Sequence, residues 1–286
     1  MKKIKVILEM IKFEHTVFAL PFAFLGAILG SMTVEGTWPT IMEWIFITLA
    51  MVGARSAAMT LNRVIDANID KKNPRTADRA IPAGDVSIPQ SLLFIAASFA
   101  LLFIAAFSLN LLTVLMLPLF VFLLTFYSYT KRFTWLCHVF LGVTIAMAPV
   151  GGWIGATGQF SVELLFLFLT VAFWTAGFDV IYATQDADYD RRVKLHSIPA
   201  RFGIAKALRI SKGFHLISFA SLLLLSLLSP LGWLFLIGVI IVGAIMVYEH
   251  SLVKPNDLTK VGVAFFQMNG IISITMLVFA IGDLLI

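Results

Sequence analysis

The feature that most constrains the fold is a series of apolar segments, each long enough to cross a membrane. A helix needs about 20 apolar residues to cross roughly 30 Å of hydrocarbon, and nine such spans can be placed. The predicted spans are 13–33, 41–61, 89–108, 110–128, 134–155, 161–183, 214–229, 231–249 and 262–282. Charged residues make up 13% of the chain, against roughly 25% in an average soluble domain. The sequence therefore predicts an all-α polytopic membrane protein with one domain over residues 1–286.

The positions of the 21 lysines and arginines test this number of spans. They lie at the N-terminus, around the end of span two and the segment after it, and in the segments that follow spans four, six and eight. Because basic residues gather on the cytoplasmic side, we expect a cytoplasmic N-terminus and an external C-terminus in the cell membrane. The net charge of +5 then faces the anionic lipid bilayer or a phosphorylated ligand, so nucleic acid is not expected as a partner.

The spans fall into two similar units. Two four-helix repeats are predicted at about 13–128 and 134–249, followed by a ninth helix at 262–282. Spans two and six run in the same direction, and each leads into a long polar segment, 62–88 and 184–212. Sites of membrane proteins often lie where such repeats meet, so we expect the site at the cytoplasmic ends of these two spans.

Each of the two polar segments opens with a row of acids. The first motif, "NRVIDANID", spaces its polar residues four apart: Asn62, Asp66 and Asp70. The second places three acids and a tyrosine close to one helical face: Asp179, Tyr182, Asp186 and Asp190. Residues four apart lie on the same side of a helix, which predicts one polar face at each helix end. Asp188 is one position off this row and is interpreted as solvated surface.

Carboxylates that converge on one point repel each other and need cations. Oxygen ligands without histidine or cysteine favour Mg²⁺, which commonly takes one or two carboxylates and completes its shell with water and phosphate. Basic residues accompany both motifs, among them Arg75, Lys131 and Lys194. One acidic cluster alone would fit a solvated membrane boundary equally well. Two clusters on parallel spans favour a Mg²⁺–diphosphate clamp.

Three stretches resemble known motifs. "NRVIDANIDKKNPRTADRAIPAG" and "DVIYATQDADYDRRVKLHSIPARFG" resemble the two signatures of the UbiA superfamily of intramembrane prenyltransferases, and "YSYTKRFTWL" resembles a third segment of that family. The resemblance implies a ring of nine helices around a central cavity, capped by the two polar segments. It also implies Mg²⁺-dependent transfer of a prenyl chain from a polyprenyl diphosphate to an acceptor, often an aromatic ring.

The resemblance assigns roles to individual residues. Four carboxylates would bind the metal: Asp66, Asp70, Asp186 and Asp190. Three basic residues would contact the diphosphate: Arg75, Lys131 and Lys194. Three further residues would serve catalysis: Asn62, Asp179 and Tyr182. Asp179 is the acid nearest the helix interior, and we hypothesise that it orients the acceptor or takes its proton.

The acceptor is less well defined. "IKFEHTVFALPFAFLGA" and "APVGGWIGATG" resemble a branch of the family associated with menaquinone made through the futalosine route. Both 4-hydroxybenzoate and a dihydroxynaphthoate therefore stay open, as do haem and a lipid alcohol. Arg55 lies inside an apolar span, and because a buried charge is costly in lipid, we expect it to point inward. A secondary transporter is the leading alternative without enzyme activity.

Overall fold

The computed structural model of the chain describes every residue except 1–5, 8 and 12–15. Helices dominate this described part, and no strand is present in it. The long helices are α2 (Thr16–Val34), α3 (Ile41–Ile65), α5 (Ile88–Phe107), α6 (Leu111–Thr130), α7 (Cys137–Thr157), α8 (Val162–Ala183), α11 (Ile204–Leu228), α12 (Trp233–Leu252) and α13 (Asn269–Leu284). The short elements are α4 (Ala67–Asp70), η2 (Thr184–Asp186), α9 (Ala187–Arg192), α10 (Ile198–Phe202) and the π-helix η3 (Val263–Met268).

The predicted membrane fold is confirmed. Eight helical segments of the described chain are long and apolar enough to cross a membrane, and α2 contributes a shorter apolar stretch, Leu20–Val34. The number nine stays a prediction, because the start of the first predicted span lies outside the described residues. One boundary was wrong: α11 begins at Ile204 rather than at 214. The amphipathic stretch "IAKALRISKGF" continues the helix beyond the apolar run.

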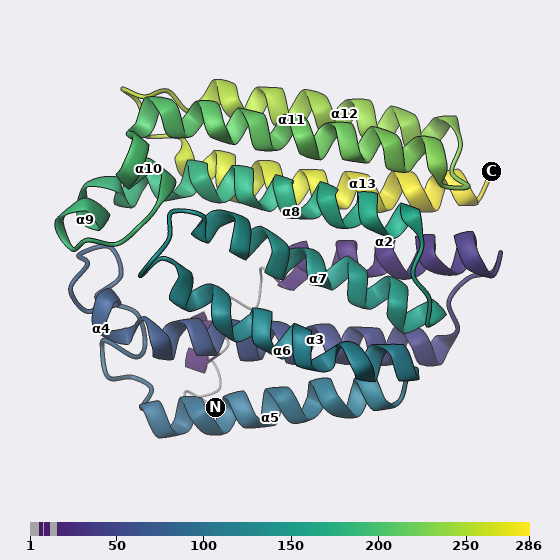
Figure 1. Cartoon of the computed structure of the whole chain (residues 1–286), viewed down its shortest axis with the longest axis horizontal. Coiled ribbons are helices and arrows are strands. Elements are labelled where there is room, and N and C mark those ends of the chain that lie inside the picture. The colour runs from purple at the N-terminus through teal and green to yellow at the C-terminus, as the bar shows by residue number, and fades with distance from the viewer. Residues whose placement is uncertain (1–5, 8, 12–15) are drawn as a thin grey trace.

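The helices lie side by side, with α2 and α7 near the middle of the molecule (Figure 1). α2 packs against α7, α3 against α5, and α8 against both α7 and α11. The backbones of α2 and α7 come very close, since a Cβ atom on Gly152 would lie 2.0 Å from the carbonyl oxygen of Ala23. Small residues permit such close packing of membrane helices.

Side-chain caps fix where several helices begin. Thr40 and Ser87 form capping boxes with Glu43 and Gln90 at the starts of α3 and α5. Asn110 caps α6 and also donates hydrogen bonds to the carbonyl groups of Ile154 and Gly155 on α7. These caps satisfy backbone N–H groups that would otherwise lack partners, and the bond from Asn110 ties two helices together.

Both acidic rows are broken by a bend, which the helical spacing did not predict. α3 ends at Ile65, and Asp66 (φ −92°, ψ 2°) leads into the separate helix α4. At the corresponding point of the second unit, Asp186 (φ −100°, ψ 1°) is the last residue of η2 and directly precedes α9. The two aspartates thus share one backbone conformation at equivalent places. The short helices α4 and α9, which follow these residues, lie at the same end of the molecule (Figure 1).

Candidate functional site

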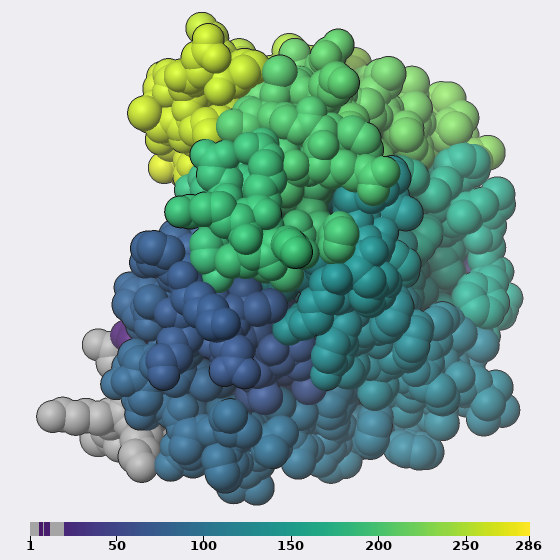
Figure 2. Space-filling view, turned by 60° about the vertical axis from the view of Figure 1, so that its left-hand side comes forward, coloured from purple at the N-terminus to yellow at the C-terminus, as the bar shows by residue number. Residues whose placement is uncertain are grey.

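The two polar segments meet at one end of the helices. On the surface, residues 60–90 and 185–205 lie against each other (Figure 2). The phenol of Tyr189 on α9 donates a hydrogen bond of 3.0 Å to the carbonyl oxygen of Ile69 on α4. The amide of Asn73 donates to Asp186 Oδ1 over 3.2 Å. These bonds join the first acidic motif to the second.

Arg75 makes the strongest connection between the motifs. Its guanidinium binds both carboxylate oxygens of Asp186, with Nε–Oδ1 at 2.9 Å and Nη2–Oδ2 at 2.5 Å. Its third nitrogen, Nη1, donates to the phenol oxygen of Tyr182 over 3.0 Å. Burial lowers the pKa of Arg75, but the hydrogen bonds and charge of Asp186 outweigh this and raise it above its ordinary value. Arg75 is therefore a permanent cation between two residues of the second motif.

Asp66 is buried, with 1% of its surface exposed, and binds two cations. Lys131 Nζ lies 2.5 Å from Oδ2, and Arg132 Nη2 lies 2.9 Å from Oδ1. The amide of Asn62 donates to the same carboxylate over 3.2 Å and also to the hydroxyl of Ser128. Asp66 thus contacts both Asn62 and Lys131, and the end of α6 closes this side of the site.

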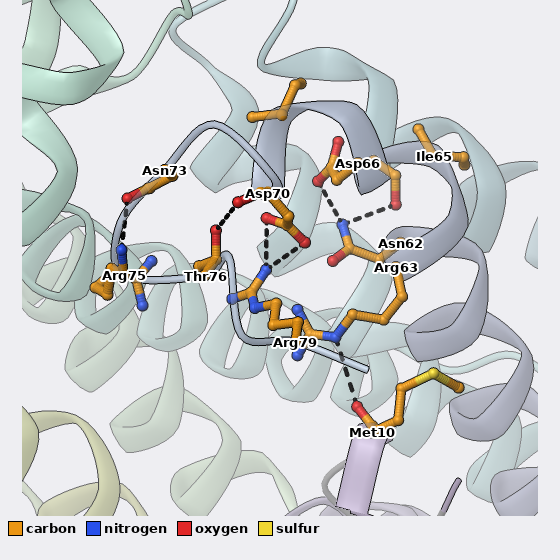
Figure 3. A network of polar contacts seen from close by, with 12 residues as sticks. Met10, Asn62, Arg63, Ile65, Asp66, Asp70, Asn73, Arg75, Thr76 and Arg79 are labelled. Carbon is orange, nitrogen blue, oxygen red and sulfur yellow. Dashed lines mark hydrogen bonds and ion pairs between the residues drawn. The ribbon is translucent and has the colours of Figure 1, made fainter. Parts of the chain in front are cut away.

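Asp70 is also buried and is held by Arg79 (Figure 3). Nη1 of Arg79 lies 2.8 and 2.7 Å from its two carboxylate oxygens. The hydroxyl of Thr76 donates to the backbone oxygen of Asp70 over 3.0 Å. The loop after α4 therefore folds back on the acid that precedes it, because Arg79 supplies the compensating charge.

Asp190 and Lys194, the two remaining predicted site residues of the second loop, have no side-chain hydrogen bond to the other predicted site residues in the described part of the chain. Asp190 accepts a hydrogen bond of 2.8 Å from the hydroxyl of Ser197, which also caps α10. Lys194 has a positive φ of 60° and an exposed side chain. No hydrogen bond or ion pair within the described residues ties the Lys194 side chain to the other site residues. Its role toward a diphosphate stays a prediction.

Asp179 has a partner that the sequence interpretation missed. His138, at the start of α7, places Nδ1 2.7 Å from Asp179 Oδ2. The backbone N–H of Ile198 donates to His138 Nε2 over 3.2 Å. Since Nε2 accepts this bond, the ring hydrogen sits on Nδ1 and is donated to Asp179. Nothing in the local sequence pairs residues 41 positions apart, so the acidic motifs alone gave no signal for His138.

The four predicted metal ligands fit Mg²⁺ by their chemistry, although they do not converge on one point. Among the described residues, no group of three histidines, cysteines or acids is arranged to hold a metal ion. The reason is that three of the carboxylates have basic partners of their own: Asp66, Asp70 and Asp186. A Mg²⁺ ion commonly uses only one or two carboxylates together with phosphate oxygens. The donor set is therefore compatible with a metal bound jointly with an anionic ligand.

An apolar cavity lies among α2, α3, α5, α6 and α7. Its walls carry many small or apolar side chains, including Ala54, Ala106 and Phe120. Arg55 and Tyr127 line it as well. The expectation that Arg55 points inward is confirmed, and it brings a cation to a cavity whose walls are mostly apolar.

Comparisons with known proteins agree with this arrangement. Residues 19–271 match the model of the UbiA prenyltransferase family. The 4-hydroxybenzoate octaprenyltransferase of Vibrio atlanticus (strain LGP32) is 28% identical over 221 residues, which cover 77% of this chain and 78% of that protein.

Solved structures are similar over nearly the whole chain. The apo structure of a UbiA homolog from Aeropyrum pernix K1 has a TM-score of 0.85 at 32% identity, covering 95% of this chain and 98% of that one. A UbiA homolog from Archaeoglobus fulgidus bound to DMAPP and Mg²⁺ has a TM-score of 0.76 at 17% identity, covering 98% and 99%. At 17% identity, the comparison with the Archaeoglobus fulgidus protein shows a shared fold alone.

Proposed function

The chain belongs to the UbiA prenyltransferase family, and on that premise we propose that it transfers a polyprenyl chain from a polyprenyl diphosphate to an aromatic hydroxy-carboxylate in quinone biosynthesis. The proposal includes Mg²⁺ as cofactor. The observation that carries it is the bidentate pair of Arg75 and Asp186, which joins the two acidic motifs at one site.

The polar cluster suits a diphosphate with its metal. Four carboxylates would hold Mg²⁺: Asp66, Asp70, Asp186 and Asp190. When bound, the metal would neutralise charge on the departing diphosphate. Arg75 and Lys131 would turn from their aspartates to the diphosphate oxygens, and Lys194 would approach from the second loop. Preorganised cations stabilise charge that develops on a leaving group. The archaeal homolog bound to DMAPP and Mg²⁺ supports this proposal by its similar fold.

The chemistry at carbon then requires little from the protein beyond placement. The allylic carbon–oxygen bond breaks, and the diphosphate leaves with the bonding electrons. A ring carbon of the acceptor forms the new bond to the allylic carbon. The ring then loses its proton to a base, for which we propose Asp179, oriented by His138 over 2.7 Å. Tyr182 and Asn62 would border the reacting atoms. Tyr182 would be held there by its hydrogen bond from Arg75, and Asn62 by its hydrogen bond to Asp66.

The cavity supports an acceptor with a carboxylate. Arg55 would pair with that carboxylate, and the apolar walls would receive the aromatic ring and the first units of the prenyl chain. The bacterial relative named as a 4-hydroxybenzoate octaprenyltransferase favours 4-hydroxybenzoate. A dihydroxynaphthoate has the same two functional groups and fits the same features. The transporter alternative has no remaining support, because the family consists of prenyltransferases.

The proposed location is the cytoplasmic face of the cell membrane. The short helices α4 and α9, which follow the two bends in the acidic motifs, lie at the end of the molecule away from the C-terminus (Figure 1). The distribution of lysine and arginine supports a cytoplasmic position for that end. The acceptor would then reach the site from the cytoplasm, and the released diphosphate would leave to the same side.

The test is prenyl transfer by the purified protein in lipid. Labelled 4-hydroxybenzoate and dihydroxynaphthoate would be offered separately with a long polyprenyl diphosphate and Mg²⁺. The proposal predicts that label moves into the lipid extract and that EDTA abolishes this. Transfer to haem or to a lipid alcohol instead would overturn the proposed acceptor. Folded protein that transfers the chain to none of these compounds would contradict the enzyme assignment to this substrate class.

A further inference from the structure

The start of the last membrane helix contains a turn of unusual width. The π-helix η3 (Val263–Met268) runs directly into α13. Such turns are rare and frequently lie at functional sites. None of its residues belongs to the two acidic motifs or has a role in the proposed mechanism. Its position is nevertheless informative, because Phe265 within it contacts Tyr182 of the second motif.

A buried amide holds this turn open. Asn269, with 6% of its surface exposed, donates from Nδ2 to the carbonyl oxygen of Phe265 over 2.8 Å and approaches that of Ala264 at 3.4 Å. A π-turn displaces backbone carbonyl groups from the regular helical bonds, and carbonyls without partners are costly inside a membrane. The side chain of Asn269 therefore supplies the bonds that make the wide turn stable.

The turn puts an aromatic ring against Tyr182. The ring centroids of Phe265 and Tyr182 are 4.1 Å apart at an angle of 32°, and the edge of Phe178 completes the contact at 5.3 Å from Phe265. Arg75 Cζ also lies over the Tyr182 ring, 5.3 Å from its centroid. The ring of Tyr182 thus already faces one cation and is supported by a neighbouring ring. Aromatic faces attract cations.

We infer that the π-turn is a positioning device for the reaction: Phe265, held by Asn269, fixes the ring of Tyr182 as an aromatic wall that shields the allylic cation from water. This rests on the proposed function. The allylic carbon is attached to the diphosphate, and Arg75 links the diphosphate region to the Tyr182 phenol. A regular α-turn at this point would rotate Phe265 away from Tyr182, since each added residue changes the helical direction by about 100°.

The consequence concerns a competing reaction. If water reaches the cation, its oxygen bonds to the allylic carbon and a proton is released, which gives prenyl alcohol and diphosphate. Closed sites suppress such side reactions of reactive intermediates. Without the ring of Phe265 against it, Tyr182 would move more freely and would shield the allylic cation from water less well. Phe265 is therefore a positioning residue that acts through Tyr182, and its loss should change the ratio of prenyl alcohol to prenylated acceptor.

The test measures both products from labelled polyprenyl diphosphate, with purified protein, Mg²⁺ and saturating acceptor. Phe265→Leu should lower kcat about five- to tenfold and raise the ratio of alcohol to transfer product by a similar factor. Phe265→Tyr keeps the ring and should retain the wild-type ratio. Asn269→Leu should shift the ratio in the same direction as Phe265→Leu. Phe107→Leu, whose ring on α5 is 69% exposed, is the matched control and should change neither quantity.

If Phe265 had only a structural role, replacing it would reduce the amount of folded protein without changing the ratio of prenyl alcohol to prenylated acceptor. Phe265→Met fills the same space with a flexible chain, and it replaces Phe265→Leu if that variant does not fold. Folded Phe265→Leu or Phe265→Met with the wild-type ratio and kcat would overturn the inference and leave the proposed function intact. Wild-type protein that forms neither product would instead overturn the proposed function.

Discussion

Arg75 and Asp186 lie 111 residues apart in the chain, yet they form a bidentate ion pair that joins the two acidic motifs. The side chains are only partly exposed, 34% and 18%, so the pair is shielded from water more than an ordinary surface ion pair. Together with the hydrogen bonds of Asn73 and Tyr189, this contact holds the first loop against the second. It also links the phenol of Tyr182 to the same cation.

Arg75→Lys tests the shape of that contact. Lysine keeps the charge but cannot bind two oxygens and a phenol at once. Because a charge-assisted hydrogen bond contributes about 1.5–3 kcal/mol, kcat/KM for the polyprenyl diphosphate should fall about 10- to 100-fold. Arg209→Lys, an exposed arginine on α11, is the control and should stay near wild type. Equal activity of the two variants would show that the bidentate geometry is unimportant.

Asp179→Asn tests the proposed base. The amide cannot take a proton, and general base catalysis typically contributes about 10²- to 10⁴-fold. We expect kcat to fall by that order, while KM for the diphosphate changes little. His138→Gln should have a smaller effect, because it loosens the orientation of Asp179 without removing the carboxylate. Steady-state kinetics with Asp188→Asn as control, an acid whose side chain is 86% exposed, checks both. Full activity of Asp179→Asn would eliminate this residue as the base.

Arg55→Gln tests recognition of the acceptor. Loss of the cation should raise KM for 4-hydroxybenzoate about tenfold or more, since hydrogen bonds to a charged group are strong. The KM for polyprenyl diphosphate serves as an internal control and should be unchanged. The methyl ester of the acceptor has no carboxylate, so its KM should be insensitive to the substitution. A similar loss for the acid and the ester would contradict the role of Arg55.

The fold itself can be tested at two adjacent glycines of α7. A Cβ on Gly152 would meet the backbone of α2 at 2.0 Å, whereas a Cβ on Gly151 finds its nearest neighbour, Phe120, at an ordinary 3.6 Å. Gly152→Ala should therefore destabilise the protein by about 1–3 kcal/mol or more. Gly151→Ala should be neutral or stabilising by up to about 1 kcal/mol, because alanine favours helix. Thermal unfolding in detergent distinguishes them, and equal melting temperatures would contradict the close packing of α2 and α7.

Much of this architecture could be predicted from the sequence, because lipid imposes strong rules on composition. The apolar runs located α5 (Ile88–Phe107) and α8 (Val162–Ala183) to within a residue. Helical spacing also predicted that Asn62 and Asp66 share one face, and their side chains are in contact. The bends at Asp66 and Asp186 were missed, since neither glycine nor proline marks them and the spacing alone is compatible with a continuous helix.

Contacts between distant segments were the hardest to predict. The pairing of Arg75 with Asp186 depends on how two loops fold over the helix ends, which the spacing within either loop does not determine. The contact between His138 and Asp179 depends likewise on the packing of α7 against α8. The same holds for Phe265, whose position depends on a π-turn stabilised by Asn269. Local patterns indicate which residues are chemically suited to a site, and packing decides which of them meet.

The central claim is that both acidic motifs together hold one Mg²⁺–diphosphate. The most direct measurement is Mg²⁺-dependent binding of labelled polyprenyl diphosphate to the wild type, Asp66→Asn, Asp186→Asn and the double variant, with Asp188→Asn as control. The account predicts that each single variant loses most of the binding that Mg²⁺ supports and that the double variant loses little more, because the two carboxylates serve one ligand. Full binding by either single variant, or losses that simply add, would contradict a shared site.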